Sequence, residues 1–568
     1  MIAALGYALG PPALYAATRE LSRSRAAASF AALTFIFAPS ASYLLPGLIG
    51  DASAFAGAAL PPPWRLVALV EYGEGPHVLS LSLALFALVA TARYVRVPSS
   101  LGFVVAVVTL VAVALTNLIG VLGAALFVIL LPASERIGGR AEGRWWRVLS
   151  VGVIAALLSL GWYSLGFIRA VFGFSAPGGA EASAYALLPV LLVAMLIAIA
   201  WLDRRVPHGA ALVIGWVFVF GAIVVARQLF GMTIAPQPIR YALELDAAVA
   251  IGIGIACAAL LGRLAMRAGE RAALGAGLAA AAVVVALGAG GWLAVRDRLA
   301  PDDTWRDWSE RRVAIWLDEH LALGERAYLT GDHAFWLNAF ADVPQVRGGV
   351  DFAFANPWWA HVTYQVNTGA DAAIAARWMR ALPARYIVVP GPASSEVYRD
   401  YADPLKFDGR LPVVFEERGV RIYEVSRVGD PVLVVARLAD LPVPTSAIDV
   451  SALDRYLDRI ASGHPAAALQ DRGLGAWRAD VVVADGEAVV LRQAYDSGWH
   501  ALVDGRSADV RADPIGQLLI DVPPGRHVLE LDHRVHNDLL AGVAVALFTM
   551  LALVVGWIRS RLRGVRAT

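Results

Sequence analysis

Long apolar runs dominate the first half of the chain, whereas polar segments with mixed periodicity dominate the second half. A helix needs roughly 20 apolar residues to cross about 30 Å of hydrocarbon. Eleven runs are therefore candidate membrane helices: 1–18, 26–48, 77–92, 101–117, 118–132, 145–170, 184–202, 208–228, 242–265, 272–298 and 538–558. The stretch 101–132 is too long for one span, and Asn117 and Gly120 at its middle predict two short helices that meet there.

The positions of the arginines predict how these spans are oriented, because loops on the cytoplasmic side carry an excess of basic residues. The basic clusters are Arg19/Arg23/Arg25, Arg93/Arg96, Arg136/Arg140/Arg144/Arg147, Arg204/Arg205, Arg263/Arg267/Arg271 and Arg559/Arg561/Arg563/Arg566. With the spans given above, every cluster falls on the cytoplasmic side, and residues 299–537 fall outside. We therefore expect a multi-pass protein of the cell membrane with an extracytoplasmic polar part.

The same count places Met1 outside the membrane, with no earlier helix to carry it there. The first run lacks a positive n-region, so it does not have the pattern of a signal peptide. Two explanations stay open: either the N-terminus crosses unaided, or a helix and an outer loop precede Met1.

Composition supports this division. The chain is 58% hydrophobic and 17% charged, with mean hydropathy +0.60, whereas soluble domains carry about 25% charged residues. Only 32 of the 95 charged residues lie in 1–298. A formal net charge of +1 gives no support for a nucleic-acid partner, and the single cysteine, Cys257, cannot form an intramolecular disulfide. Disordered chains, secreted disulfide scaffolds and plain cytosolic enzymes are excluded.

The first part of the polar half alternates helical and strand patterns. Residues 305–320 and 371–382 have helical spacing, and 327–329, 386–389 and 421–425 are strand-like. We expect an extracytoplasmic α/β domain over 299–430.

Short strands follow, at 481–484, 488–493, 501–503, 517–522 and 528–531. Asp485-Gly486 and Asp504-Gly505 predict hairpin turns, because both central positions of such a turn take positive φ. We expect a β-sandwich domain over 431–537. The predicted organisation is completed by a polytopic helical domain at 1–298 and a C-terminal helix with a basic cytoplasmic tail at 538–568.

Four stretches carry a resemblance to a known family: AALTFIFAPSASYLL (31–45), LTNLIGVLGA (115–124), PQPIRYALELDAAVAIG (236–252), and YDSGWHALVDG with PPGRHVLEL (495–505 and 523–531). Together they resemble the GT-C superfamily of membrane glycosyltransferases, and especially the YfhO-like bacterial proteins, some of which are described as 6-pyruvoyl-tetrahydropterin synthase-related. The resemblance implies a GT-C-like bundle of about 11 helices and a polyprenyl-phosphate sugar donor. It also implies an earlier helix and a loop bearing the catalytic acid, both of which lie outside this sequence.

The expected chemistry needs a carboxylate that deprotonates the acceptor or holds a divalent cation, Mg²⁺ or Mn²⁺. Asp51, Glu71 and Glu74 are acids predicted at the outer face, and His77 follows them. We take these four as catalytic candidates. The alternative is that they are solvated loop residues, and no pair of acids has a spacing specific for a metal.

Cationic groups are needed to hold the phosphate of the donor. Arg240 follows Pro236 and Pro238 at the start of an apolar run, and we assign it to the donor phosphate together with Arg169. The alternatives are an Arg240–Glu244 ion pair at i,i+4 and an Arg169 that snorkels to the membrane surface.

Aromatic residues gather in FAFANPWWAHVTY, where Trp358, Trp359, His361 and Tyr364 are candidates for acceptor binding. The alternative is that this cluster is core or docks the domain onto the membrane surface.

The hypothesis is an integral-membrane glycosyltransferase that moves a sugar from a lipid-linked donor to a cell-envelope glycan or glycolipid. The alternatives are a non-catalytic glycan-binding or envelope-assembly protein, which an absent catalytic loop favours, and a lipid-linked-glycan transporter.

Overall fold

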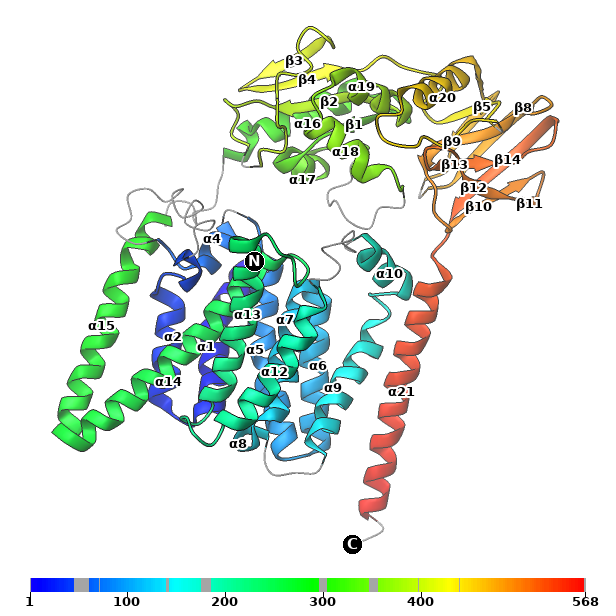
Figure 1. Ribbon diagram of the computed structural model, residues 1–568. Coiled ribbons are helices and arrows are strands. Elements are labelled where there is room, and N and C mark those ends of the chain that lie inside the picture. Colours follow the sequence, from blue (N-terminus) through cyan, green and yellow to red (C-terminus); the bar gives the residue numbers. More distant parts are fainter. Residues whose placement is uncertain are drawn as a thin grey trace. The chain divides into compact units, whose positions relative to one another are not determined.

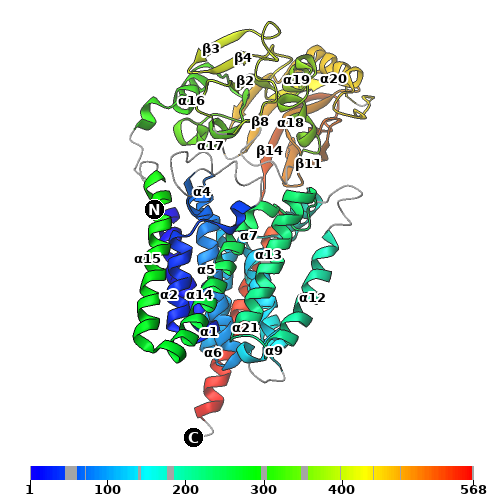
Figure 2. The same ribbon diagram turned by 60° about the vertical axis from the view of Figure 1, so that its left-hand side comes forward.

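The computed structural model describes residues 2–44, 61–70, 72–138, 143–174, 185–295, 304–346, 356–396, 398–438, 440–473 and 475–565. The chain divides into two compact units. We call Met1–Pro301 with Asp538–Thr568 the helical unit, and Asp302–Asn537 the mixed unit. Figures 1 and 2 show the elements of each.

The described part of the helical unit is built from α-helices and short 3₁₀ turns. Its elements are α1 (Ile2–Ser22), α2 (Arg25–Phe37), η1 (Ala41–Leu44), α4 (Trp64–Val70), α5 (Gly75–Arg96), α6 (Ser100–Thr116), α7 (Leu118–Ile129), η3 (Leu131–Ala133), α8 (Glu135–Gly138), α9 (Arg144–Ser159), α10 (Leu165–Phe174), α12 (Leu187–Leu202), α13 (Ala210–Phe230), η4 (Pro238–Tyr241), α14 (Ala242–Ala268), α15 (Glu270–Val295) and α21 (Asn537–Val565).

In the part of the chain that the structure describes, five helical segments are long and apolar enough to cross a membrane: Gly75–Arg96, Ala210–Phe230, Pro238–Ala268, Glu270–Leu293 and Asn537–Arg559. The protein is therefore a membrane protein, although the expected count of about eleven spans is not confirmed. The predicted span 145–170 is interrupted, because α9 ends at Ser159 and α10 begins at Leu165.

The predicted break inside 101–132 is confirmed. Helix α6 ends at Thr116, and the side chain of Asn117 accepts a hydrogen bond from the Gly120 backbone N–H at 3.0 Å, which caps α7. An asparagine at this position satisfies one of the free N–H groups of the new helix.

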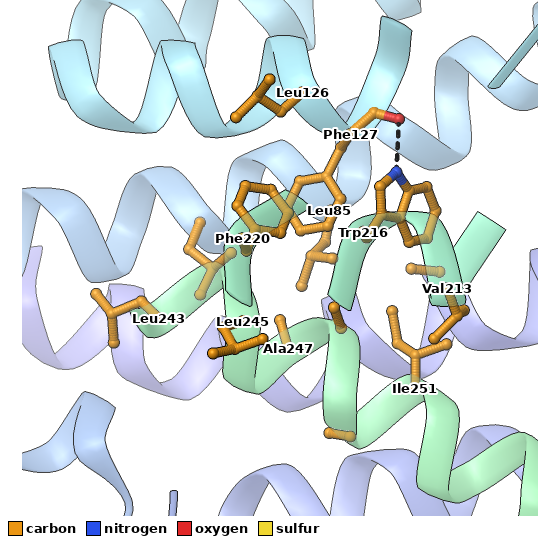
Figure 3. Packing of buried hydrophobic residues seen from close by; sticks show 14 of the residues in the cluster. Leu85, Leu126, Phe127, Val213, Trp216, Phe220, Leu243, Leu245, Ala247 and Ile251 are labelled. Carbon is orange, nitrogen blue, oxygen red and sulfur yellow. Dashed lines mark hydrogen bonds between the residues drawn. The ribbon is translucent and has the colours of Figure 1, made fainter. Parts of the chain in front are cut away.

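The core of the helical unit lies where α13 and α14 pack against the earlier helices, as Figure 3 shows. The Trp216 indole donates to the Phe127 carbonyl at 3.2 Å and packs edge-on against the Phe127 ring. Small residues permit close helix contacts: a Cβ at Gly254 of α14 would lie 2.3 Å from the Ala27 carbonyl oxygen of α2. The middle of α14 is thereby fixed against α2.

The mixed unit begins with a four-stranded sheet in the order β1-β2-β4-β3. Its strands are β1 (Arg326–Tyr328), β2 (Ala384–Pro390), β3 (Val413–Glu417) and β4 (Val420–Glu424), and only β1 and β2 pair in parallel. Four helices pack on it: α16 (Ser309–His320), α17 (Gly331–Phe340), α18 (Trp359–Asn367) and α19 (Ala372–Ala381).

Alternation along β2 divides the core between the two faces of this sheet. Tyr386 and Val388 pack with α16 and α17. Ile387 and Val389 pack in the cluster that contains α18 and α19. That second cluster continues into the β-rich part, because it also includes Val434 and Leu519.

Two five-stranded sheets complete the mixed unit, in the orders β11-β10-β14-β8-β7 and β12-β13-β9-β5-β6. The strands are β5 (Leu433–Ala436), β6 (His464–Pro465), β7 (Ala468–Asp471), β8 (Trp477–Val483), β9 (Ala488–Ala494), β10 (Trp499–Val503), β11 (Arg506–Ala508), β12 (Val510–Ala512), β13 (Gln517–Ile520) and β14 (Gly525–His533). Apolar residues of both sheets, such as Val481 and Leu491, share one core, and α20 (Val450–Ser462) packs beside β5.

The two predicted Asp-Gly hairpins have different outcomes. Asp504-Gly505 joins β10 to β11 as a two-residue hairpin, with φ of 51° and 78°. The prediction for Asp485-Gly486 is wrong, because β8 pairs with β14 and β7 whereas β9 pairs with β13 and β5. That turn carries the chain from one sheet of the sandwich to the other.

Candidate functional site

The candidate residues of the helical unit gather at the start of α14. Gln237 has a left-handed backbone (φ 48°, ψ 57°), and Pro238 then begins the 3₁₀ turn η4. The α-helix starts only at Ala242, which places Glu244 in its first turn. Because Arg240 lies on the 3₁₀ turn, it does not share an α-helical face with Glu244.

Arg240 instead contacts the chain before α5. Its Nη2 lies 2.9 Å from Oε1 of Glu74, the residue that precedes the first turn of α5. The side chains of Arg240 and Glu74 are 39% and 16% exposed, so this ion pair lies at the edge of the apolar unit.

A second pair lies deeper. His77 Nε2 is 3.0 Å from Glu244 Oε1, and the exposed fractions of the two side chains are 0% and 1%. His77 Nδ1 is 3.9 Å from Glu74 Oε2, so the two pairs are adjacent. We call Arg240, Glu74, His77 and Glu244 the polar row: cation, acid, imidazole and acid follow one another from the edge into the interior.

Helix α7 makes room for this row. A Cβ at Gly123 would lie 2.5 Å from Glu244 Oε1 and 3.0 Å from its Cγ. A Cβ at Gly120 would lie 2.0 Å from Ser80 Oγ, one turn beyond His77 on α5. Glycine is therefore required at both positions for α7 to approach the helices that carry the row.

Asp246 follows two residues after Glu244 and belongs to a different group. Its Oδ1 accepts a hydrogen bond from Ser40 Oγ at 2.6 Å. Asp246 and Arg65 both line a cavity of about 110 Å³ between α2 and α14, and they attract each other electrostatically.

Arg65 is the most unusual charge in the helical unit. It is 2% exposed, and its guanidinium lies over the rings of Tyr7 and Phe35, at 4.0 and 4.2 Å from the ring centroids. None of its three nitrogens has a hydrogen-bond partner among the described residues. Buried charges are normally paired and hydrogen-bonded, so this cation has unused capacity to bind an anion.

The sequence-predicted residues separate accordingly. Glu74, His77 and Arg240 are brought together, and the alternative pairing of Arg240 with Glu244 is replaced by two other pairs. Arg169 is an exposed residue of α10, and no described hydrogen bond or ion pair joins it to the row. Asp51 and Glu71 lie outside the described residues.

Sequence reasoning missed Arg65, although a signal was present. It is the lone charge in the apolar segment WRLVALV, directly after three prolines. A charge within an apolar helix commonly marks a functional site.

The aromatic candidates lie in the mixed unit, at the start of α18. Trp359 is 5% exposed and packs against Tyr328, so its ring belongs to the core. Trp358 is half-buried, packs against Trp378 and donates to the Pro514 carbonyl at 3.3 Å. His361 and Tyr364 are the exposed pair, with Tyr364 57% exposed.

A cavity of about 360 Å³ lies within the mixed unit. Arg326, Arg492, Asn356, Gln517, Trp359 and Trp499 are among its lining residues. Burial and the neighbouring Arg492 lower the pKa of Arg326 to about 10, so Arg326 remains charged at neutral pH. The mixture of cations, amides and indoles suits a polar ligand with apolar faces.

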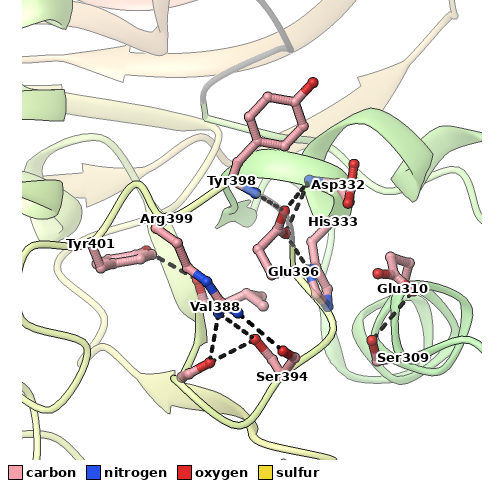
Figure 4. A network of polar contacts seen from close by, with 11 residues as sticks. Ser309, Glu310, Asp332, His333, Val388, Ser394, Glu396, Tyr398, Arg399 and Tyr401 are labelled. Carbon is pink, nitrogen blue, oxygen red and sulfur yellow. Dashed lines mark hydrogen bonds and ion pairs between the residues drawn. The ribbon is translucent and has the colours of Figure 1, made fainter. Parts of the chain in front are cut away.

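Another polar network of the mixed unit, shown in Figure 4, organises a loop. The buried Glu396 accepts from the backbone N–H groups of Asp332 and Tyr398, and it lies 3.1 Å from His333 Nδ1. Burial acts to raise the pKa of Glu396, but the hydrogen bonds from His333 and from the two backbone groups outweigh it and lower this pKa. The network joins α17 to the segment after β2.

No protein-family model and no curated protein sequence matches the chain. Among solved structures, the arabinofuranosyltransferase AftD from Mycobacteria aligns over 94% of this chain and 51% of its own, with 15% identity and a TM-score of 0.45. The Archaeoglobus fulgidus oligosaccharyltransferase in the apo form aligns over 93% of this chain and 82% of its own, with 13% identity and a TM-score of 0.39. This chain spans about half the length of AftD.

Proposed function

We propose that this protein is a GT-C-type, YfhO-like membrane glycosyltransferase that transfers a sugar from a polyprenyl-phosphate donor to a cell-envelope glycan or glycolipid. The observation that carries the proposal is the polar row, a cation and two acids around an imidazole inside an apolar helical unit. Ionisable groups at such depth are costly to bury, and they commonly mark pathways and substrate sites.

The reaction breaks the bond between the sugar C1 and the phosphate oxygen, and it forms a bond from C1 to the acceptor oxygen. The acceptor hydroxyl gives its proton to a carboxylate, and the departing phosphate keeps the bonding electron pair. Arg240 can form two parallel hydrogen bonds with a phosphate. When the phosphate takes the N–H groups of Arg240, Glu74 is released from its ion pair and becomes the acceptor for the proton.

His77 and Glu244 act as positioning residues. The hydrogen bond between His77 Nε2 and Glu244 Oε1 fixes the imidazole, and its Nδ1 then faces Glu74 at 3.9 Å. In this arrangement the imidazole supports the charge on Glu74 as the proton moves. Arg65, whose nitrogens lack described partners, supplies a second cation for an anionic donor.

The described residues of the helical unit do not fit the Mg²⁺ or Mn²⁺ that this chemistry often uses. Glu74, Glu244 and Asp246 are engaged by Arg240, His77 and Ser40 respectively. The group of His and acidic residues close enough to share an ion lies in the mixed unit instead. No step is therefore assigned to a metal here.

The mixed unit would bind or orient the acceptor. Its 360 Å³ cavity and the exposed Tyr364 support this role. The proposal places residues 299–537 outside the cytoplasm, where the basic clusters of the helical unit predict them to be.

The test uses the full chain in liposomes, supplied with polyprenyl-phospho-sugars and envelope glycans. We expect transfer by the wild type, loss of transfer in Glu74→Gln and Arg240→Gln, and normal transfer in Glu135→Gln. The last variant removes an ion pair of the same unit, between Glu135 and Arg204, that is exposed. Equal activity of Glu74→Gln and Glu135→Gln would refute the catalytic role of the row.

A non-catalytic glycan-binding protein is the second candidate. The observation that favours it is that Glu74, Glu244 and Asp246 each already have a partner. Saturable binding of lipid-linked sugar, lost in Arg240→Gln, without turnover by the wild type would identify this function.

A further inference from the structure

Three potential metal ligands converge where β14 ends. Asp496 lies in the turn before β10, His533 ends β14, and His536 immediately precedes α21. His533 Nε2 is 3.0 Å from Oδ2 of Asp496, and His536 Nε2 is 3.2 Å from its Oδ1. One ligand atom from each residue lies within 4.8 Å of the others, and no other group of this kind occurs among the described residues.

The backbone holds the three side chains together. Asp496 Oδ1 accepts from the Gly498 N–H at 2.6 Å, and the Gly498 carbonyl accepts from the Arg534 N–H at 2.8 Å. A Cβ at Gly498 would lie 2.7 Å from both the Arg534 carbonyl oxygen and His533 Nε2. Glycine at 498 therefore lets the turn approach the end of β14 closely enough for Asp496 to reach both histidines.

The donor set and its dimensions suit a first-row transition metal. Two imidazoles and one carboxylate are typical ligands of Zn²⁺ at catalytic sites, where a fourth position stays open. Zinc–ligand bonds of about 2.1 Å in a tetrahedron separate neighbouring ligand atoms by about 3.4 Å. The two measured separations, 3.0 and 3.2 Å, are close to this value, so a small outward movement of the side chains would admit the ion.

Supporting contacts orient both rings. Ser497 Oγ lies 3.2 Å from His536 Nδ1, so that Nε2 is the nitrogen presented to Asp496. The His533 ring packs edge-on against Trp499 at 5.2 Å. Contacts of this kind to the far side of a ligand fix its orientation and raise metal affinity.

The location leaves room for exchangeable ligands. Asp496 and His533 also line the 360 Å³ cavity of the mixed unit, and the side chains of Asp496, His533 and His536 are 29%, 35% and 40% exposed. We propose that these three residues bind one divalent transition-metal ion, Zn²⁺ in the first instance, at the rim of this cavity, with a fourth position open to water or to a polar ligand. The proposal is independent of the glycosyltransferase assignment.

The experiment uses the full chain in detergent, free of any histidine tag and stripped with a chelator. Zn²⁺ is titrated by calorimetry, and Co²⁺ is followed by its visible absorption, which is intense only in tetrahedral sites. We expect one ion per chain and a tetrahedral Co²⁺ spectrum. Asp496→Asn and His533→Ala should each weaken binding by roughly 100-fold or more, and Ser497→Ala by roughly 10-fold.

His464→Ala is the matched control, because His464, at 3.6 Å, pairs with the single carboxylate of Glu487 and has no second histidine beside it among the potential metal-ligand groups of the described residues. Binding should be unchanged in this variant. The proposal is overturned if wild-type stoichiometry falls well below one, if Co²⁺ stays octahedral, or if Asp496→Asn binds as the wild type does. Ser497→Ala keeps all three ligands. If this variant binds the metal more weakly but unfolds at the wild-type temperature, the loss of binding is due to the metal site and not to a folding defect.

Discussion

Gly123→Ala tests whether the polar row depends on the close approach of α7. The new Cβ would lie 2.5 Å from Glu244 Oε1, 3.0 Å from its Cγ and 3.1 Å from its Cδ. Such separations are too short, so either α7 or the Glu244 side chain must move. Glu244 is 1% exposed and tied to His77, which leaves the carboxylate little space to retreat.

Two contributions set the size of the effect. Inserting a methyl group into a packed interior costs typically about 1–3 kcal/mol. If the carboxylate moves instead, the charge-assisted hydrogen bond to His77, with a contribution of about 1.5–3 kcal/mol, is weakened. We therefore expect a loss of about 1–3 kcal/mol in the free energy of unfolding, together with a loss of sugar transfer.

The assay is denaturant unfolding of the full chain in detergent, followed by tryptophan fluorescence and paired with the transfer assay. Gly152→Ala is the matched control: Gly152 lies inside the apolar helix α9, and beyond the adjoining backbone of that helix no atom of the described residues lies within 4 Å of the added Cβ. There the substitution should be neutral, or stabilising by about 0.5–1 kcal/mol through helix propensity.

A double-mutant cycle tests the cause. In a Glu244→Ala background the clash is absent, so Gly123→Ala should cost less than it does in the wild type by about 1 kcal/mol or more. A clash between the added Cβ and Glu244 is ruled out if Gly123→Ala is as harmless as Gly152→Ala, or if its cost is the same in both backgrounds.

Three further predictions concern other charges. Folding lowers the pKa of Glu396, so its carboxylate stabilises the folded state above about pH 4.3, and this stabilisation is lost as the pH falls through the folded pKa. When the free energy of unfolding is measured against pH, Glu396→Gln should therefore show a smaller loss on acidification than the wild type. The hydrogen bond to Asp504 raises the pKa of His527, so protonated His527 stabilises the folded state fully below about pH 6.5, and this stabilisation is lost as the pH rises through the folded pKa. The difference in unfolding temperature between the wild type and Asp504→Asn should therefore shrink as the pH is raised above about 6.5. Replacing both His77 and Glu244 by leucine should leave the free energy of unfolding within about 1–2 kcal/mol of the wild-type value, whereas Glu244→Leu alone should cost about 3–5 kcal/mol. The reason is that replacing a buried pair by apolar groups is tolerated better than leaving one partner unpaired. The double and the single variant should both lose sugar transfer.

Local pattern predicted elements well where one physical signal decided the outcome. Asn117 caps α7 at the predicted break, because its short side chain reaches the backbone N–H of Gly120, three residues ahead, without help from distant residues. Asp504-Gly505 and Asp485-Gly486 have the same turn chemistry, yet only the first closes a hairpin. The second joins two different sheets, which depends on the pairing partners β14 and β13 far along the chain.

The candidate site shows the same limit. The i,i+4 spacing gave an Arg240–Glu244 pair as the alternative to phosphate binding, but Arg240 lies on the 3₁₀ turn η4 and its guanidinium contacts Glu74. Composition alone could not separate the buried from the exposed residues of the aromatic cluster, because Trp359 is buried against Tyr328, a residue on another element. The group formed by Asp496, His533 and His536 has no short sequence motif, because Asp496 lies 37 residues from His533 along the chain.

Two buried arginines show why satisfaction of hydrogen bonds, rather than burial, distinguishes a structural charge from a functional one. Arg492 is 1% exposed, and its two terminal nitrogens donate to the backbone carbonyls of Val428, Asp430, Arg380 and Ala381. Its two terminal nitrogens therefore stabilise the junction of several segments, and only its Nε lacks a partner among the described residues. Arg65 is 2% exposed, yet it has aromatic rings beneath it, a cavity beside it and no described hydrogen-bond acceptor. A buried cation that lacks an acceptor among the described residues costs free energy unless an anion binds to it. We therefore propose that the phosphate of the proposed donor binds at Arg65 during function.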